Sequence, residues 1–321
     1  TTGGTGSTVF NFNCLGSPTA GASLLQMQMV PSVAYKVAKQ HTIGAGLTLS
    51  VQQFRAYGLQ AFGIDEDGKG LGYTASQGDL TNRGNDYSYG AGIRVGWLSK
   101  FFKDRLSIGL NYASRTYMTK FDKYKNLFAE QGAFDIPEHY SIGLAVKATD
   151  KLTIAADYQK IKYGDIAAIA NQGPNPKDPF NFFPSGCQSR PDGTNSCMLG
   201  QNDGMGFGWH DQHIYKVGIN YDYSPAWSFR AGYNHAESPI QDNQVLFNFL
   251  APAVNEDHVT VGLSYRPNKN MEWNVNYMHA FKNTIKGPTA LGPVGGLPVN
   301  GENASIDMYI NSIGVSFGYS M

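Results

Sequence analysis

Apolar and polar residues alternate along most of this chain, in stretches of about ten residues that turns or loops separate. Near the C-terminus, for example, Met271, Trp273 and Tyr277 alternate with Glu272 and Asn274. Because successive side chains on a β-strand point to opposite faces, this pattern gives each strand one apolar and one polar face. Strands with one face for lipid and one for water are typical of a transmembrane antiparallel β-barrel. We therefore predict an all-β membrane protein.

The alternation predicts about eleven strands, and short connections alternate with long ones along the chain. The predicted strands cover residues 24–37, 41–61, 85–99, 104–119, 133–148, 151–164, 210–224, 226–237, 255–267, 270–284 and 303–320. Short connections such as 149–150 are typical of periplasmic turns, and long ones such as 165–209 are typical of outer loops. Bacterial barrels with both termini inside have an even number of strands, so we expect an odd number upstream to close this one.

The composition supports a single barrel domain over residues 1–321. No run of about 18 apolar residues is present, so no stretch of the chain is suited to crossing a bilayer as a helix. The 38 glycines, 19 tyrosines and 18 phenylalanines suit tight turns and aromatic girdles at the membrane interfaces. A soluble all-β protein would also alternate, but edges such as Ile43, Ala45 and Leu47 are uniformly apolar. Because the chain begins without a signal segment, we expect an export signal to precede it.

Charge and cysteine content limit the partners of this chain. Its 25 basic and 25 acidic residues cancel, so we expect no nucleic acid partner. Cys187 and Cys197 stand in a loop rich in proline, glycine, asparagine and serine, and the nine residues between them allow a local disulfide in an oxidising compartment. Cys14 would then be free or would pair outside this chain. No close cysteine pair or histidine cluster accompanies the cysteines, so we predict no metal site and no cofactor.

Two parts of the chain carry the motifs of a known family. The first part begins at Lys120 and ends in Phe134-Asp-Ile-Pro-Glu138. The second part contains Gly204-Met-Gly-Phe-Gly-Trp209, Trp227-Ser-Phe-Arg-Ala-Gly-Tyr-Asn234 and Asn248-Phe-Leu-Ala-Pro-Ala-Val254. In both parts the chain resembles the FadL family of outer-membrane transporters for hydrophobic compounds. The resemblance implies a barrel of fourteen strands that an N-terminal hatch plugs. The hatch and about three strands have no counterpart here, which leaves eleven.

A candidate substrate site lies in the first of these parts. Apolar residues between 120 and 132 recur at spacings of three and four, which predicts a short amphipathic helix on an outer loop. In the resembled family, this loop and the one before it form a hydrophobic groove where substrate first binds. The resemblance and the spacing together assign nine groove residues: Leu59, Phe62, Ile64, Leu71, Tyr73, Phe121, Tyr124, Leu127 and Phe128. Packing of the two loops on each other is the alternative interpretation.

Charged residues fall into two further groups. If the substrate is a carboxylate, three loop cations are candidates for its head group: Arg83, Lys120 and Lys123. On the strands, six charged residues take the polar, lumen-facing positions and are expected to pair across the interior: Arg94, Arg115, Asp157, Lys216, Arg230 and Glu272. We interpret this second group first as structural filling of the lumen, and second as a conduction path.

These observations predict passive outer-membrane transport of a hydrophobic small molecule, either a long-chain fatty acid or an aromatic or aliphatic hydrocarbon. No serine–histidine–aspartate or paired-carboxylate motif emerges, so we expect a protein that is not an enzyme. We expect a monomer surrounded by outer-membrane lipid and lipopolysaccharide. Two other classes stay open. A general porin would pass hydrophilic solutes through an open lumen, and a barrel scaffold would anchor a partner protein.

Overall fold

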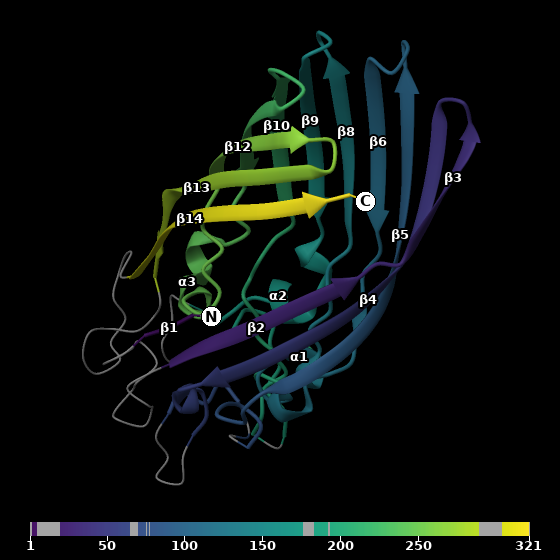
Figure 1. Ribbon diagram of the computed structural model, residues 1–321. Coiled ribbons are helices and arrows are strands. Elements are labelled where there is room, and N and C mark those ends of the chain that lie inside the picture. The colour runs from purple at the N-terminus through teal and green to yellow at the C-terminus, as the bar shows by residue number, and fades with distance from the viewer. Residues whose placement is uncertain are drawn as a thin grey trace.

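The computed structural model describes residues 2–4, 20–64, 70–74, 76, 78–175, 183–191, 193–288 and 304–320. Within these ranges the strands form one antiparallel sheet whose order follows the chain (Figure 1). The described residues contain no helix with the length and apolar character needed to span a membrane. Cys14 lies outside the described residues.

Fourteen strands make up the sheet. Twelve of them follow one another in the order β1 (Thr2–Gly4), β2 (Ala20–Met29), β4 (His41–Tyr57), β5 (Asp86–Phe101), β6 (Leu106–Ala113), β8 (His139–Lys147), β9 (Leu152–Ile161), β10 (Gln212–Asp222), β11 (Trp227–Ala236), β12 (Asp257–Asn268), β13 (Met271–Gly287) and β14 (Ala304–Tyr319). The other two, β3 (Ser32–Ala38) and β7 (Tyr117–Met118), pair with β4 and β5.

All eleven strands that the alternation predicts are present, but two of them are interrupted. The predicted strand 24–37 is divided into β2 and β3 around Pro31, which has no N–H to donate to the ladder. Both parts keep one register against β4, because Met29 lies opposite Leu49 and Ser32 lies opposite Gly46. The predicted strand 104–119 is divided into β6 and β7, and its register against β5 shifts by one residue between them. The sequence did not predict β1.

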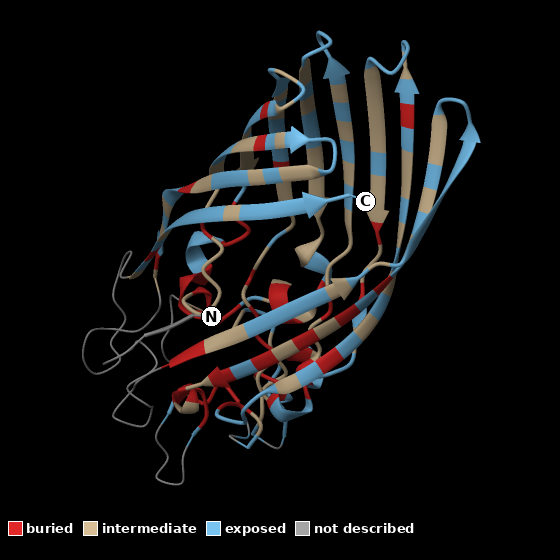
Figure 2. Ribbon diagram, in the orientation of Figure 1, coloured by how far each residue is buried: buried red, intermediate tan, exposed pale blue. Residues whose placement is uncertain are grey.

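The strands turn their large apolar side chains outward. On β10, Val217 and Ile219 are exposed, and on β13 Trp273 and Val275 are exposed. Small or polar residues of the other parity, such as Ser264, are buried. Figure 2 shows the resulting exposed bands along the strands. This is the arrangement that a lipid-facing wall requires, because the hydrocarbon core of a bilayer accepts apolar side chains and excludes polar ones. We call this surface the strand wall.

Short turns join the strands at one end of the sheet, and long connections gather at the other end (Figure 1). Their short helical turns lie on the concave side of the sheet (Figure 1). The turns are η2 (Gln60–Phe62), η3 (Asp122–Tyr124), α1 (Ala129–Gly132), η4 (Tyr163–Asp165), α2 (Ala167–Ala170), η5 (Asp242–Gln244) and α3 (Val245–Asn248). The largest hydrophobic cluster of the described residues forms here rather than between two layers of regular structure.

Candidate functional site

The outer segment 120–132 folds as two separate turns, which corrects the prediction of a single amphipathic helix. One turn is η3, and the other is α1, in which Glu130 and Gln131 have positive φ angles of 56° and 59°. Both residues donate their backbone N–H groups to carbonyl groups of a neighbouring loop, at Gln201 and Gly200. Hydrogen bonds between loops therefore replace those that a continuous helix would form within itself.

The long connections pack on one another through a buried set of side chains that we call the loop cluster. Its larger members are Phe54, Leu59, Phe62, Tyr73, Leu80, Phe121, Tyr124, Phe128, Leu199, Met205, Leu246 and Phe247. Most of them come from the loops, and Phe54 comes from β4. Four different connections contribute, so the cluster joins segments that are far apart in the sequence. Burial of this much apolar surface is what holds loops of irregular structure in place.

Aromatic contacts organise the loop cluster. The ring of Phe54 lies 4.8 Å from that of Phe128 and 4.9 Å from that of Tyr124, measured between centroids. On the other side, the rings of Phe62 and Phe247 lie 5.3 Å apart. These distances are those at which aromatic pairs stabilise each other beyond simple burial. The rings therefore connect β4 to the outer loops.

Tyr124 also fixes the loop to the sheet by polar contacts. Its hydroxyl donates to the carbonyl oxygen of Gly84 at 2.6 Å and accepts from the backbone N–H of Ala56 at 3.1 Å. Burial raises the pKa of Tyr124, and it raises that of Tyr73 well above the usual value. Both phenols therefore stay neutral at physiological pH, and the loop cluster contains no tyrosinate charge.

The structure brings the two predicted groove walls together, but as a packed core instead of an open groove. Five of the nine residues are almost fully buried: Leu59, Phe62, Tyr73, Phe121 and Tyr124. Phe128 is also buried, and Leu71 and Leu127 pack against the cluster from its edge. Ile64 is 55% exposed and is the one predicted groove residue outside the cluster. The alternative interpretation of loop-on-loop packing therefore describes much of this region.

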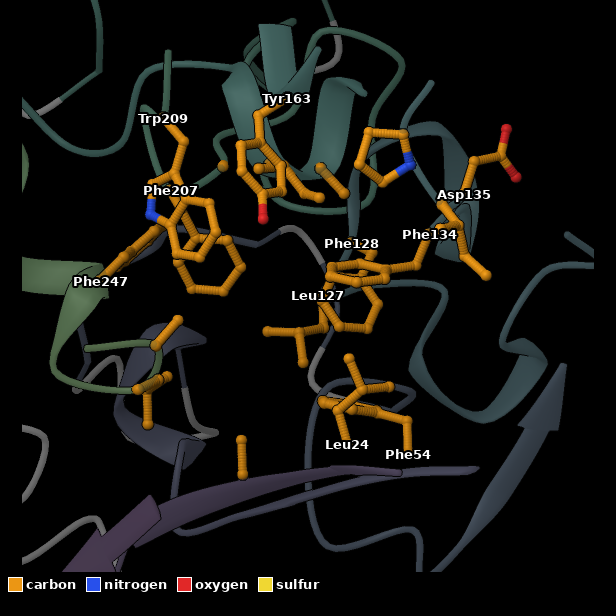
Figure 3. Close-up of a pocket in the computed structure, with 18 of the residues that line it drawn as sticks. Leu24, Phe54, Leu127, Phe128, Phe134, Asp135, Tyr163, Phe207, Trp209 and Phe247 are labelled. Carbon is orange, nitrogen blue, oxygen red and sulfur yellow. The ribbon is translucent and has the colours of Figure 1, made fainter. Parts of the chain in front are cut away.

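A cavity of about 570 Å³ remains between the loop cluster and the strands. Four predicted groove residues line it: Leu59, Phe62, Leu127 and Phe128. The strands β2, β4, β8 and β9 contribute Leu24, Phe54, Gln159 and others, and the later loops contribute Tyr163, Trp209 and Phe247. Figure 3 shows these rings and aliphatic chains around one open space. A mostly apolar cavity of this size is typical of a site for a small hydrophobic ligand.

Several cavity residues escaped the sequence-based assignment, among them Tyr163, Leu199, Phe207, Trp209 and Phe247. Phe207 and Trp209 belong to a family-like motif, yet nothing in the local pattern shows which way their rings point. The motif could therefore have marked these two residues as candidates, but only the fold shows that they line the cavity. Burial raises the pKa of Tyr163, so its hydroxyl is a neutral part of the cavity wall.

The loop that supplies Leu199 and Met205 is closed by a disulfide between Cys187 and Cys197, whose Cα atoms lie 5.6 Å apart. The carbonyl of Cys197 accepts the N–H of Met205, and the N–H of Leu199 donates to the carbonyl of Tyr73. The disulfide that the spacing allowed is therefore present, and it stands directly beside residues that line the cavity.

The three predicted head-group cations lie on the loops and do not line the cavity. Arg83 is paired with Asp79 at 3.5 Å. The ammonium groups of Lys120 and Lys123 donate to Gln131 and to the carbonyl of Asn85. Each cation is exposed or half-exposed and already has a protein partner, as expected for a solvated loop charge.

Two of the six predicted lumen charges form ion pairs. Arg115 is paired with Asp135 at 2.7 Å, and Glu272 is paired with Arg266 at 3.3 Å. Asp135 lines the cavity, but it also accepts the backbone N–H of Met118, and Figure 3 shows its carboxylate turned away from the rings. Its charge is therefore compensated outside the cavity.

The remaining four lumen charges contact neutral groups or a neighbouring strand. Arg230 donates to Ser264 at 2.6 Å, and Lys216 donates to Gln159 at 3.2 Å. Asp157 lies directly opposite Lys216 in the ladder of β9 and β10. Arg94 donates to Gln28 at 2.9 Å. The two ion pairs of this group join adjacent strands or the connections next to them, so neither is the pairing across the interior that the sequence predicts.

The chain matches one protein family over residues 4–315, described as outer membrane protein transport proteins of the OMPP1/FadL/TodX type. Among solved structures, it is similar to the toluene transporter TodX of Pseudomonas putida, with a TM-score of 0.62 and 16% identity over 100% of this chain and 77% of that one. It is also similar to the toluene transporter TbuX of Ralstonia pickettii, with a TM-score of 0.56 and 16% identity over 93% of this chain and 68% of that one. At this identity the two structures establish the fold alone. No curated protein sequence matches the chain.

The outward-facing apolar wall, the antiparallel order of the strands and the match over nearly the whole chain all lead to one assignment. The protein belongs to the FadL/TodX family of bacterial outer-membrane transport proteins.

Proposed function

We propose that this protein carries hydrophobic small molecules passively across the outer membrane, and that the cavity beneath the loop cluster is where they bind. The observation that carries the proposal is the cavity itself, with its volume of about 570 Å³ and its lining of aromatic and aliphatic side chains. Transfer of a hydrocarbon from water into such a site is favourable by roughly 0.8 kcal/mol for each methylene group. No directional contact is needed for the apolar part of the substrate.

In the proposed path, substrate first meets the outer loops, where Ile64 is exposed beside the buried Phe62. It then passes between the loops that carry Leu59 and Leu127, both of which line the cavity. A hatch at the periplasmic end of the barrel closes the cavity and shifts to release the substrate. The movement follows the concentration gradient and needs no energy coupling.

The substrate class has two candidates. The solved relatives are named as toluene transporters, which supports aromatic hydrocarbons. The cavity is also large enough for an aliphatic chain, since ligand cavities of several hundred Å³ hold molecules of drug size. A neutral aliphatic probe therefore tests the site without assuming the head group.

The test fills the cavity in the full-length protein and measures equilibrium binding of radiolabelled 1-dodecanol in detergent. Ala251 lines the cavity, and Ala251→Trp is expected to weaken binding by about tenfold or more. The indole ring would occupy space that several methylene groups of the dodecanol chain need in order to be buried. The matched control is Ala155→Trp, which adds the same volume on β9 at a position that does not line the cavity.

Equal binding by the native protein and Ala251→Trp would place the substrate elsewhere and would contradict the proposal. If the native protein binds no dodecanol but passes small hydrophilic solutes in a liposome swelling assay, the barrel is a general porin. If it neither binds dodecanol nor passes hydrophilic solutes, and it purifies with a second protein, the result supports the interpretation as a barrel scaffold.

A further inference from the structure

Positive charge gathers at three of the short turns, those that join β3 to β4, β5 to β6 and β8 to β9. We call them the basic turns. In or beside them lie the basic residues Lys36, Lys39, Lys100, Lys103, Arg105, Lys147 and Lys151, with only Asp104 and Asp150 as acidic neighbours. All of these side chains are exposed (Figure 2). The other two short turns, 223–226 and 268–270, contain a single basic residue, Lys269. One half of this end of the sheet is therefore strongly basic.

Most of the cations in the basic turns lack a protein partner. Arg105 is paired with Asp150 at 3.2 Å, and the ammonium group of Lys151 donates to the carbonyl of Tyr223 at 3.2 Å. Within the described ranges, the other five form no ion pair and no side-chain hydrogen bond: Lys36, Lys39, Lys100, Lys103 and Lys147. Like charges that are held close together repel one another, so this arrangement favours an anion that the protein itself does not supply.

Aromatic side chains place the basic turns at the surface of the membrane. Phe102 precedes Lys103 in the turn between β5 and β6, and its ring is 74% exposed. The ring of His41 lies 5.7 Å from that of Trp97 and 6.0 Å from that of Phe101, measured between centroids. Aromatic rings gather at the depth of the lipid head groups, and clusters of basic residues at that depth attract anionic lipids. Because short turns face the periplasm, the nearest head groups belong to the inner leaflet.

The strand wall next to these turns has an apolar hollow of about 420 Å³. The hollow lies on β5, β6, β8 and β9, which stand side by side in Figure 1, and its larger lining residues are Val95, Trp97, Leu110, Tyr112, Tyr140, Ile142 and Tyr158. Val95, Leu110 and Ile142 are exposed on the outward face, so the hollow opens toward the membrane. None of its lining residues lines the cavity beneath the loop cluster. An apolar hollow on this face suits the acyl chain of a lipid.

The hollow lies within reach of a lipid whose head group is at the basic turns. Leu110 stands five residues from Arg105 along β6, and Ile142 stands five residues from Lys147 along β8. At about 3.4 Å per residue the separation is about 17 Å along the strand, and a strand tilt of about 45° reduces it to a depth of about 12 Å. One leaflet contributes about 15 Å of hydrocarbon. The tail of an inner-leaflet lipid is therefore long enough.

We propose that the basic turns and the hollow form a binding site for one inner-leaflet phospholipid with an anionic head group. The phosphate lies among Lys100, Lys103 and Lys147, and one acyl chain lies in the hollow. Lys103 is in the turn itself, and the long apolar stems of Lys100 and Lys147 carry their ammonium groups past the ends of β5 and β8. The site is on the outside of the barrel and is independent of the proposed function.

The experiment uses native mass spectrometry of the full-length protein in detergent to measure the dissociation constants of dioleoylphosphatidylglycerol and dioleoylphosphatidylcholine. The two probes have the same tails and differ in the net charge of the head group. One variant combines Lys100→Gln, Lys103→Gln and Lys147→Gln. Its matched control combines Lys269→Gln, Lys282→Gln and Lys286→Gln, which remove the same charge from exposed positions in or beside β13. Circular dichroism confirms that each variant is folded.

A second pair of variants tests the hollow. Val95→Trp fills it, and both probes should lose affinity because they share the same tails. Val217→Trp is the matched control, since it makes the same change at an exposed outward position of β10 that does not line the hollow.

We expect the native protein to bind the phosphatidylglycerol at least about tenfold more tightly than the phosphatidylcholine. The variant of the basic turns should lose most of this preference, and its control should keep it. Val95→Trp should weaken binding of both lipids by about fivefold or more, with Val217→Trp unchanged. A native protein without the preference, a preference that survives in the variant of the basic turns or is lost equally in its control, or a Val95→Trp variant with native affinities would overturn the inference. Binding of dodecanol tests the proposed function separately, so either can fail without the other.

Discussion

The strand wall and the loop cluster place their apolar side chains in opposite directions. On the wall, residues such as Val217 and Trp273 face outward and are exposed. In the loop cluster, residues such as Phe121 and Leu59 face inward and are fully buried. The wall leaves its apolar side chains exposed, as suits a membrane environment, whereas the loops build an apolar environment from their own side chains. One protein can therefore keep apolar side chains away from water in two ways, by facing a membrane or by packing them on one another. The two regions should respond differently to the same substitution.

The largest difference should come from removal of an aromatic ring. Phe121→Ala leaves a void in the loop cluster, where Phe121 is fully buried but does not line the cavity, and we expect a loss of about 3–5 kcal/mol in the free energy of unfolding. Phe229→Ala on the wall, where Phe229 is 47% exposed, should cost less than about half of that, since lipid or detergent fills the space. Denaturant titration of the protein in detergent measures both. Equal losses would mean that the wall is packed against protein.

An added charge should cost more on the outward face of the strand wall than on its lumen face. Val217→Lys puts an ammonium group on the outward face of β10, and we expect a cost of about 2–4 kcal/mol if that position lies near the middle of the bilayer. Asn220→Lys, on the opposite face of the same strand, should cost less than about 1 kcal/mol because the lumen is polar. The measurement is folding into lipid bilayers. A tolerated lysine at residue 217 would show that this face does not contact lipid.

The disulfide should stabilise the loops and leave the wall unchanged. Cys187→Ser together with Cys197→Ser opens a loop with a sequence separation of 10 residues, and loop-closure entropy predicts a loss of about 2–3 kcal/mol. Hydrogen exchange should become faster around Leu199 and Met205 and stay the same in β13. Faster exchange in β13 would show that the loop cluster and the strands unfold as one unit.

The smallest effect is expected from the loop cations. Lys123→Met removes an exposed ammonium group whose partner is the backbone carbonyl of Asn85, so we expect a change of less than about 0.5 kcal/mol and no change in ligand binding. Equilibrium binding of dodecanoate to this variant and to the native protein, measured in detergent, tests whether this loop cation contacts the head group of an acidic ligand. A clear loss of acid binding in Lys123→Met would place the head group among the outer loops.

Alternation was sufficient to predict the strands because the signal is local. Every second residue of a strand points to the same face, so the apolar residues of one parity identify the outward face. Met271, Trp273 and Val275 were assigned to that face without knowledge of any contact distant in the sequence. The alternation did not predict where a strand is interrupted, because a single residue such as Pro31 is enough to break the hydrogen-bond ladder. The candidate site was predicted only in part, because Leu127 and Phe128 were assigned but Trp209 and Phe247 were not.

The amino-acid sequence by itself determined the strand wall, its membrane environment and the separation of the chain into short turns and long loops, since a period of two is imposed by the strand backbone. Only the tertiary structure decided how the loops pack. Their side chains meet across connections that are far apart in the chain, and hydrogen bonds between loops override the helical spacing of residues 120–132. It also decided which charges are compensated, because the guanidinium of Arg115 forms an ion pair with Asp135 whereas that of Arg94 donates to the neutral Gln28, a difference that depends on packing and not on residue type.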